Sequence, residues 1–150
     1  MNRGQAALEF LMTYGWAILV VLAAIGALAY FGVLKPDRFL PEKCTIAPGL
    51  DCRDFLVKST TARFDLRNAL GKDINIDAAA MGINCNETLS TPIYIENGDL
   101  GTIIIGAGDA PCANGNPGVK IKEDLIFTYT DVETNITKII TGSIITKVQP

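Results

Sequence analysis

Residues 3–34 read RGQAALEFLMTYGWAILVVLAAIGALAYFGVL, and this stretch determines most of what the sequence predicts. After Glu9 no charged residue occurs until Lys35. As a helix, the uncharged run over residues 10–34 would extend about 37 Å, whereas the hydrocarbon core of a bilayer is about 30 Å thick. We therefore expect a helix that can span a membrane, with one carboxylate close to its start.

Glu9 distinguishes this stretch from an ordinary membrane anchor. An unpaired carboxylate in hydrocarbon costs about 3 kcal/mol even on lenient insertion scales, so we expect Glu9 to have a partner. The apolar run is also longer than that of a secretory signal peptide, which predicts that the helix is retained. The simpler alternative is a single-span anchor in which Glu9 is hydrated among the headgroups. Small residues recur along the run and would let helices approach closely: Gly15, Ala17, Ala23, Ala24, Gly26, Ala27, Ala29 and Gly32.

Two phrases in this stretch, Gln5-Ala6-Ala7-Leu8-Glu9-Phe10 and Tyr14-Gly15-Trp16-Ala17-Ile18-Leu19, carry a family resemblance. They resemble the N-terminal region of archaeal type IV pilins and pilin-like proteins that carry a class III signal peptide. In that family a membrane prepilin peptidase removes a short basic leader that ends in Gly. The resemblance implies a leader over residues 1–4, cleavage between Gly4 and Gln5, and a mature helix over residues 5–34. Glu9 then occupies the fifth mature position, where that family carries Glu, while Ala7 replaces a Ser found in many members.

Cleavage at this point would create an assembly charge pair. The ordinary pKa of a free α-amino group is near 8, so cleavage would create an ammonium group at Gln5, and the Glu9 carboxylate of a neighbouring copy, shifted along a filament axis, could lie beside it. Such a pair is costly to desolvate, so its better-supported role is to fix the register between copies. We therefore expect Gln5 and Glu9 to pair between subunits.

The remainder of the chain predicts a β-rich head. Pro36 and Pro41 prevent the helix from continuing, which predicts a hinge over residues 35–43. Residues 44–150 contain short strand patterns separated by turn residues and no convincing helical period. The expected fold class is α+β, a long hydrophobic helix followed by an antiparallel immunoglobulin-like β-sandwich of about seven to nine strands. The expected strands cover residues 54–58, 62–67, 74–77, 93–95, 102–105, 125–129, 137–140 and 143–148.

All four cysteines lie in the predicted head, and an even number in an exported domain favours two disulfides. A zinc site is disfavoured because the chain has no Cys-x-x-Cys spacing and no His. Three pairings are possible. We favour Cys44 with Cys52, because they bracket the turn-forming Pro48-Gly49 and because the pilin resemblance includes a similar region. This leaves Cys85 to pair with Cys112.

Two Asn-x-Thr triplets in the predicted head are candidate glycosylation sites. They begin at Asn86 and Asn135, and both are expected in turns or at strand edges. Such triplets also arise by chance in Thr-rich sequences, but the external location implied by the anchor favours modification.

Composition excludes several other functions. From Lys35 onward 12 basic and 15 acidic residues remain, a net charge of −3, and no cluster of Lys and Arg interleaved with aromatic residues predicts nucleic-acid binding. The lack of His removes the usual general base at neutral pH. No catalytic or phosphate-binding motif is present, so we expect neither an enzyme nor a cofactor or metal. Glycine-rich stretches after residue 105 are expected to be solvated turns.

The resemblance and the layout together predict the structural subunit of an archaeal type IV pilus, an adhesion-type surface filament. The resemblance implies as partners further copies of the chain, a prepilin peptidase and a platform membrane protein, together with a secretion ATPase that acts on the machinery and does not touch this chain. It also implies residence in the membrane before assembly and in an extracellular filament afterwards. The alternatives are a minor pilin-like subunit or a membrane-anchored module that binds a surface or a sugar. An archaellin is a third, less favoured alternative, because archaellins usually lack this Gln and Glu pattern and have larger heads without cysteine.

Overall fold

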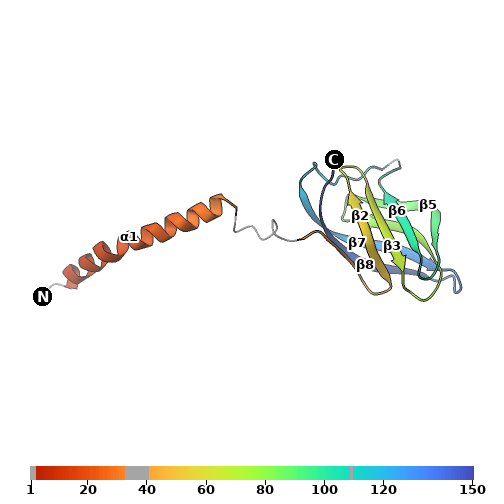
Figure 1. Cartoon of the computed structure of the whole chain (residues 1–150), viewed down its shortest axis with the longest axis horizontal. Helices are drawn as coiled ribbons and strands as arrows, with labels where there is room; N and C mark the ends of the chain where they lie inside the picture. Colours follow the sequence, from red (N-terminus) through yellow and green to blue (C-terminus); the bar gives the residue numbers. More distant parts are fainter. Residues whose placement is uncertain (1–2, 33–40, 109) are drawn as a thin grey trace. The chain divides into compact units, whose positions relative to one another are not determined.

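The computed structural model describes residues 3–32, 41–108 and 110–150. Contacts divide the chain into two compact units, one within residues 1–39 and the other within residues 40–150. The first unit contains the helix α1 (Arg3–Tyr30) and the second contains all eight described strands (Figure 1). The expected fold class, one long apolar helix followed by a sandwich of antiparallel sheets, is confirmed.

The helix α1 is 28 residues long, which corresponds to about 42 Å. In the uncleaved chain it includes Arg3 and Gly4 of the expected leader. A mature helix that begins at Gln5 after cleavage stays a prediction. The helix α1 ends at Tyr30 because Gly32 adopts a positive φ of 68°, the usual conformation of a glycine that terminates a helix. The amide of Phe31 donates to the carbonyl of Ala27 and closes the last turn. The expected end at Leu34 lies outside the described residues.

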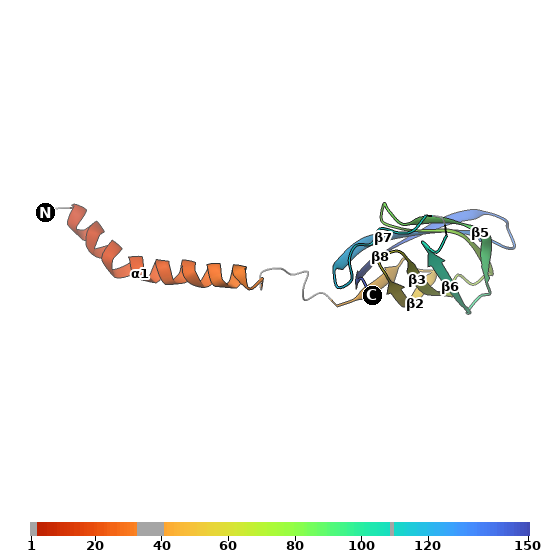
Figure 2. The ribbon, with the colours of Figure 1, turned by 90° about the horizontal axis from the view of Figure 1, so that it is seen from above.

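A bend is visible in the N-terminal half of α1 (Figure 2). The hydroxyl of Thr13 donates a hydrogen bond of 2.8 Å to the carbonyl oxygen of Glu9, one turn earlier. Bonds of this kind compete with the backbone ladder and often bend helices. Gly15 follows two residues later and lowers the local resistance to bending.

Two antiparallel sheets form the head, seen as two layers in Figure 2. The five-stranded sheet has the order β1-β8-β7-β4-β5, and the three-stranded sheet has the order β2-β3-β6. The strands are β1 (Lys43–Ile46), β2 (Leu50–Val57), β3 (Ala62–Asn68), β4 (Ile74–Met81), β5 (Asn86–Ile95), β6 (Leu100–Ile105), β7 (Lys120–Asp131) and β8 (Thr137–Lys147).

This strand order is an immunoglobulin-like arrangement with two modifications. The strands β2, β3 and β6 correspond to A, B and E, and β4, β7 and β8 correspond to C, F and G of the constant-type domain. In the constant type, strand D follows C in the chain and pairs with E. Here β5, which follows β4 (the equivalent of C), pairs with β4 and so belongs to the larger sheet. The strand β1 is additional and pairs antiparallel with β8.

Side chains that alternate along the strands build the core between the sheets. In β3 the side chains of Phe64 and Leu66 are fully buried, and in β7 those of Leu125 and Phe127 are too. The rings of Phe64 and Phe127 meet edge to face with centroids 5.7 Å apart, across the space between the sheets. This geometry is one that aromatic pairs prefer.

Several expected strands need correction. The expected strands over residues 125–129 and 137–140 are present and pair with each other, with Phe127 opposite Ile140. However, β8 continues without a break to Lys147, where two strands were expected. The strand β1 was missed because it is only four residues long. The first half of β5, which begins at Asn86, was also missed.

Residues Asn97-Gly98-Asp99 form a turn between β5 and β6, which belong to different sheets. The reason is Asn68, a fully buried polar residue at the end of β3. Its backbone amide donates to the backbone carbonyl of Asp99, and its backbone carbonyl accepts from the backbone amide of Gly98. Its side-chain nitrogen also donates to the carbonyl of Ile95. These bonds tie the turn to β3, so the chain crosses from the larger sheet to the smaller one.

The expected hinge over residues 35–43 lies mostly outside the described residues. Within the described part, Glu42 accepts a hydrogen bond from the amide of Lys147, and Lys43 already belongs to β1. The folded head therefore includes at least one residue before the expected boundary at Cys44.

Candidate functional site: the apolar helix and the surface of the head

The start of α1 contains the three residues that the sequence singled out for processing and assembly. Gly4 and Gln5 lie in the first turn of the helix, and both are exposed. Glu9 follows Gln5 by four residues, so the two side chains share one face of the helix. Within the described residues, no hydrogen bond or ion pair reaches the Glu9 carboxylate, and the backbone nitrogen of Gln5 is an uncharged peptide group. A charge pair at this place therefore needs both a freed amine and a second copy.

Large apolar side chains of α1 have no cover within the described chain. Their exposed fractions range from 46% at Leu28 to 87% at Tyr30. Apart from Arg3, Glu9 and a few uncharged polar groups, the helix is apolar on all sides, which is typical of a helix in a membrane or in the core of a larger assembly. By length and composition, residues 4–30 are sufficient to cross a membrane. In water this surface would strongly favour burial.

In the head, the first disulfide connects the two sheets near the point where the chain enters. It links Cys44 in β1 of the larger sheet to Cys52 in β2 of the smaller sheet, with the Cα atoms 6.0 Å apart. The short connection between the two strands includes Gly49, whose φ of 123° favours glycine. This is the pairing favoured above.

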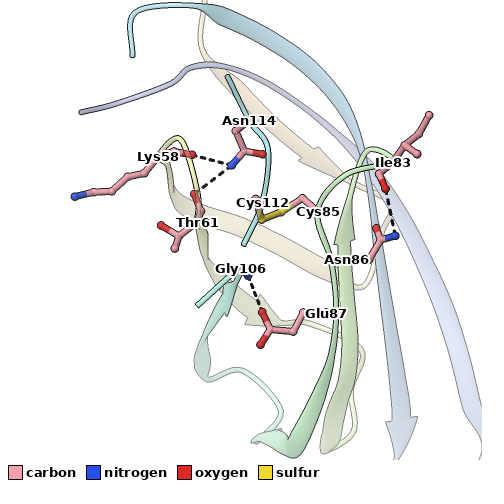
Figure 3. Close-up of a disulfide and its surroundings, with 9 residues drawn as sticks. All are labelled: Lys58, Thr61, Ile83, Cys85, Asn86, Glu87, Gly106, Cys112 and Asn114. Carbon is pink, nitrogen blue, oxygen red and sulfur yellow. Dashed lines mark hydrogen bonds between the residues drawn. A yellow bond between two sulfur atoms is a disulfide. The ribbon is translucent and has the colours of Figure 1, made fainter. Parts of the chain in front are cut away.

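The second disulfide links Cys85, which lies between β4 and β5, to Cys112, which follows β6. Figure 3 shows how the segment around Cys112 is attached to its neighbours. The side-chain nitrogen of Asn114 donates to the carbonyls of Lys58 (2.7 Å) and Thr61 (3.3 Å). The amide of Gly106 donates to the Glu87 carboxylate over 2.6 Å. A segment without regular strands is thereby held against the sheets.

The two candidate glycosylation sites differ in their surroundings. Asn135 is exposed in the turn between β7 and β8 and has a φ of 56°, a left-handed conformation that Asn tolerates better than most residues. Asn86 is exposed at the start of β5, beside the Cys85–Cys112 disulfide. Its side-chain nitrogen, the atom that a glycan would join, donates to the carbonyl of Ile83 over 3.4 Å (Figure 3).

The buried carboxylate of Asp131 stabilises the end of the head at which the chain turns from β7 into β8. The side chain of Asp131 is 2% exposed and lies 2.8 Å from the Lys72 ammonium nitrogen. It also accepts hydrogen bonds from the amides of Glu133 and Thr134. The Lys72 hydrogen bond and these amides lower the pKa of Asp131 to about 2. Nearby, bonds from the amide of Asn97 and the hydroxyl of Tyr94 lower the pKa of Asp73.

Local sequence patterns do not predict the Lys72–Asp131 pair, because the two residues are separated by 59 positions in the chain. They also do not predict a group of lysines that the sheet brings together on one face. The local signal was present in the alternating Lys120-Ile121-Lys122 of β7. Among the described residues, no group of three or more His, Cys, Asp or Glu side chains is placed to hold a metal ion.

Comparison of the chain with protein-family models and with curated protein sequences finds no match. The class of protein therefore follows from the architecture alone. A long exposed apolar helix followed by a disulfide-linked antiparallel β-sandwich is a pilin-like architecture. Together, the apolar helix and the disulfides indicate a membrane-associated or exported surface protein.

Proposed function

We propose that the chain is the structural subunit of an archaeal type IV pilus, and that it polymerises through α1 after prepilin peptidase cleaves between Gly4 and Gln5. The single observation that supports this best is the combination in α1 of an uncovered apolar surface and one carboxylate without a described partner. A bilayer would cover the surface but leave Glu9 in an unfavourable environment. A bundle of cleaved copies accounts for both features.

In the proposed bundle, the amine of Gln5 on one copy meets Glu9 on another. At neutral pH the amine is mostly protonated, so each contact neutralises one positive and one negative charge. The attraction is offset in large part by desolvation, but a copy in the wrong register would leave both charges buried and unpaired. The pair therefore selects the axial position of each incoming subunit, while the apolar surface supplies the affinity.

Contacts of this type are heterologous, because Gln5 and Glu9 lie on one chain but bind different neighbours. Heterologous contacts that do not close into a ring generate helical filaments. The head would then form the outer surface of the filament, and the oxidising conditions outside the cell keep its disulfides intact. The proposal includes residence in the cell membrane before assembly, a platform membrane protein as a further partner, and no enzymatic activity or nucleic-acid binding.

Substitution of Glu9 provides the test. We expect Glu9→Leu to lower incorporation into sheared surface filaments by at least about tenfold. A tenfold ratio corresponds to about 1.4 kcal/mol, which is well below the cost of a buried unpaired charge. The matched control is Thr13→Leu, one turn further along the helix, which also adds an apolar side chain but leaves the carboxylate. It should assemble like the wild type. Membrane levels of both variants are measured in parallel.

Wild-type incorporation of the Glu9→Leu variant would contradict the proposed pairing. Poor incorporation of both variants would also contradict it, since added apolar volume would then explain the defect. The quantity of wild-type chain in the filaments decides a separate point: a major subunit dominates the sheared material, whereas a minor subunit is scarce there.

A further inference from the structure

The outer face of the five-stranded sheet carries a group of lysines at the end where the chain enters the head. The residues are Lys43 of β1, Lys120 and Lys122 of β7, and Lys147 of β8. In the sheet register, Lys120 lies directly opposite Lys147, and Ile145 separates Lys43 from Lys122. Neighbouring strands are about 4.8 Å apart, so the four side chains originate within a patch about 10 Å across. We call this group the lysine patch.

Alternation along the strands places these side chains on the outer face. In β7 Leu125 is buried in the core, and Lys122 and Asp124 are exposed. In β8 Thr146 is buried and Lys147 is exposed, and in β1 Lys43 is exposed beside the partly buried Cys44. The half-buried Ile145 forms the apolar centre of the patch.

The charge balance of the patch differs from that of the other outer face. On the three-stranded sheet, Arg53 pairs with Asp51, Arg63 with Asp65, and Arg67 donates to the carbonyl of Gly98. In contrast, within the described residues none of Lys43, Lys122 and Lys147 forms a salt bridge, although Lys120 has a contact of its own within the chain. The acidic groups close by are Asp124, on the same face, and Glu42, which accepts from the amide of Lys147.

The head as a whole is acidic, whereas the ammonium groups of Lys43, Lys122 and Lys147 lie around one apolar residue and form no salt bridge with the described residues. Such a local positive charge suits an anionic partner outside the head. The covalent layout identifies this partner. Only residues 31–40 lie between the end of α1 at Tyr30 and the described head, and a chain of this length spans at most about 36 Å. Lys43 is the first residue of β1, so the patch lies beside the point where that segment enters the head.

We infer that the lysine patch binds the anionic headgroups of the membrane in which the apolar helix is inserted. Lysines near a membrane surface are attracted by anionic lipids over about a Debye length, and their aliphatic stems, together with Ile145, tolerate the interfacial environment. This contact holds the head against the bilayer while the subunit awaits assembly, and it is released when the helix leaves the membrane. The inference depends on the membrane-inserted state of the proposed function, but not on cleavage or polymerisation.

Lysine reactivity in the full-length chain tests this inference. The chain is reconstituted into nanodiscs of phosphatidylcholine alone or mixed with phosphatidylglycerol, at one chain per disc, and amine acetylation is quantified for each lysine by mass spectrometry. Lys138, exposed at the opposite end of β8, is the internal control. We expect acetylation of Lys43, Lys122 and Lys147 to slow by at least about threefold in the anionic discs, and Lys138 to be unchanged. About 1 M salt, where the Debye length is about 3 Å, should remove the difference.

Substitution adds a second readout. The double variant Lys122→Gln/Lys147→Gln should lose the protection of Lys43, whereas Lys138→Gln should keep it. Equal acetylation rates in both types of disc would overturn the inference. So would protection that occurs only with several chains per disc and irrespective of lipid charge, since the partner would then be an acidic surface of a second copy. Because these measurements use monomers in discs, they can fail while the Glu9→Leu result still supports filament assembly.

Discussion

The ammonium nitrogen of Lys72 lies 2.8 Å from a carboxylate oxygen of Asp131, and the pair joins the residues before β4 to the end of β7. The two strands are neighbours in the larger sheet, with Ile74 opposite Asp131. The Asp131 carboxylate also accepts hydrogen bonds from the backbone amides of Glu133 and Thr134 in the turn that leads into β8. One buried side chain thus holds three segments of the head together.

This arrangement predicts a specific loss of stability in acid. The pKa of Asp131 falls from 3.8 to about 2 on folding. A depressed carboxyl pKa contributes stability that is present above the unfolded value and is lost as the pH falls through the folded value. We expect the melting temperature of the wild type to fall more steeply between about pH 4 and pH 2 than that of Asp131→Asn. Asp124→Asn, an exposed substitution on the same strand, is the control and should follow the wild type. Parallel curves for the wild type and Asp131→Asn would contradict this role.

The two disulfides should contribute unequally to stability. In the chain-entropy model, a crosslink stabilises more when it closes a longer loop. The separation is 8 residues for Cys44–Cys52 and 27 residues for Cys85–Cys112. This predicts losses of about 2.5 kcal/mol for Cys44→Ser/Cys52→Ser and about 3.5 kcal/mol for Cys85→Ser/Cys112→Ser. Urea denaturation of the full chain in detergent micelles measures both, and a larger loss for the first pair would contradict the prediction.

Close contact between β1 and β8 depends on Gly142. In the register Gly142 lies opposite Ile46, and a Cβ atom at this position would come within 2.9 Å of the Ile46 Cα atom. Because backbone is in the way, Gly142→Ala should cost about 1–3 kcal/mol. Thr141→Ala, at the neighbouring exposed position, should change stability by no more than about 0.5 kcal/mol. An unchanged urea midpoint for Gly142→Ala would show that β1 is not held this closely.

The two glycosylation candidates should differ in occupancy. Asn135 is exposed in a turn, and its side-chain nitrogen takes part in no bond to the described chain. The corresponding nitrogen of Asn86 is bonded to Ile83, and Asn86 pairs with Ala80 in the sheet. We therefore expect native protein to carry more glycan at Asn135 than at Asn86. Glycopeptide mass spectrometry measures both sites, with Asn135→Gln as the control for assignment. Greater occupancy at Asn86 than at Asn135 would contradict this prediction, and so would masses that show no glycan at either site.

Local patterns in the sequence were sufficient to predict much of this fold. The uncharged run predicted α1, and alternation in residues 62–67 and 125–129 predicted β3 and β7. The favoured cysteine pairing is also confirmed, and it had depended on the local turn between Cys44 and Cys52 and on the pilin resemblance. Features that depend on long-range contacts were missed. Asn68, which directs the crossing from β5 to β6, bonds to partners as far along the chain as Asp99, and β1 forms because β8 offers it an edge. The lysine patch was missed for the same reason, because only the pairing of β1, β7 and β8 brings its residues together.

The central claim is that the chain is cleaved at Gly4 and assembles through the amine that this exposes. N-terminal sequencing of the chain from sheared surface filaments, combined with its intact mass, tests this most directly. We expect a chain that begins at Gln5 and lacks residues 1–4. A chain in filaments that still begins at Met1 would contradict it, because the amine that pairs with Glu9 would then not exist.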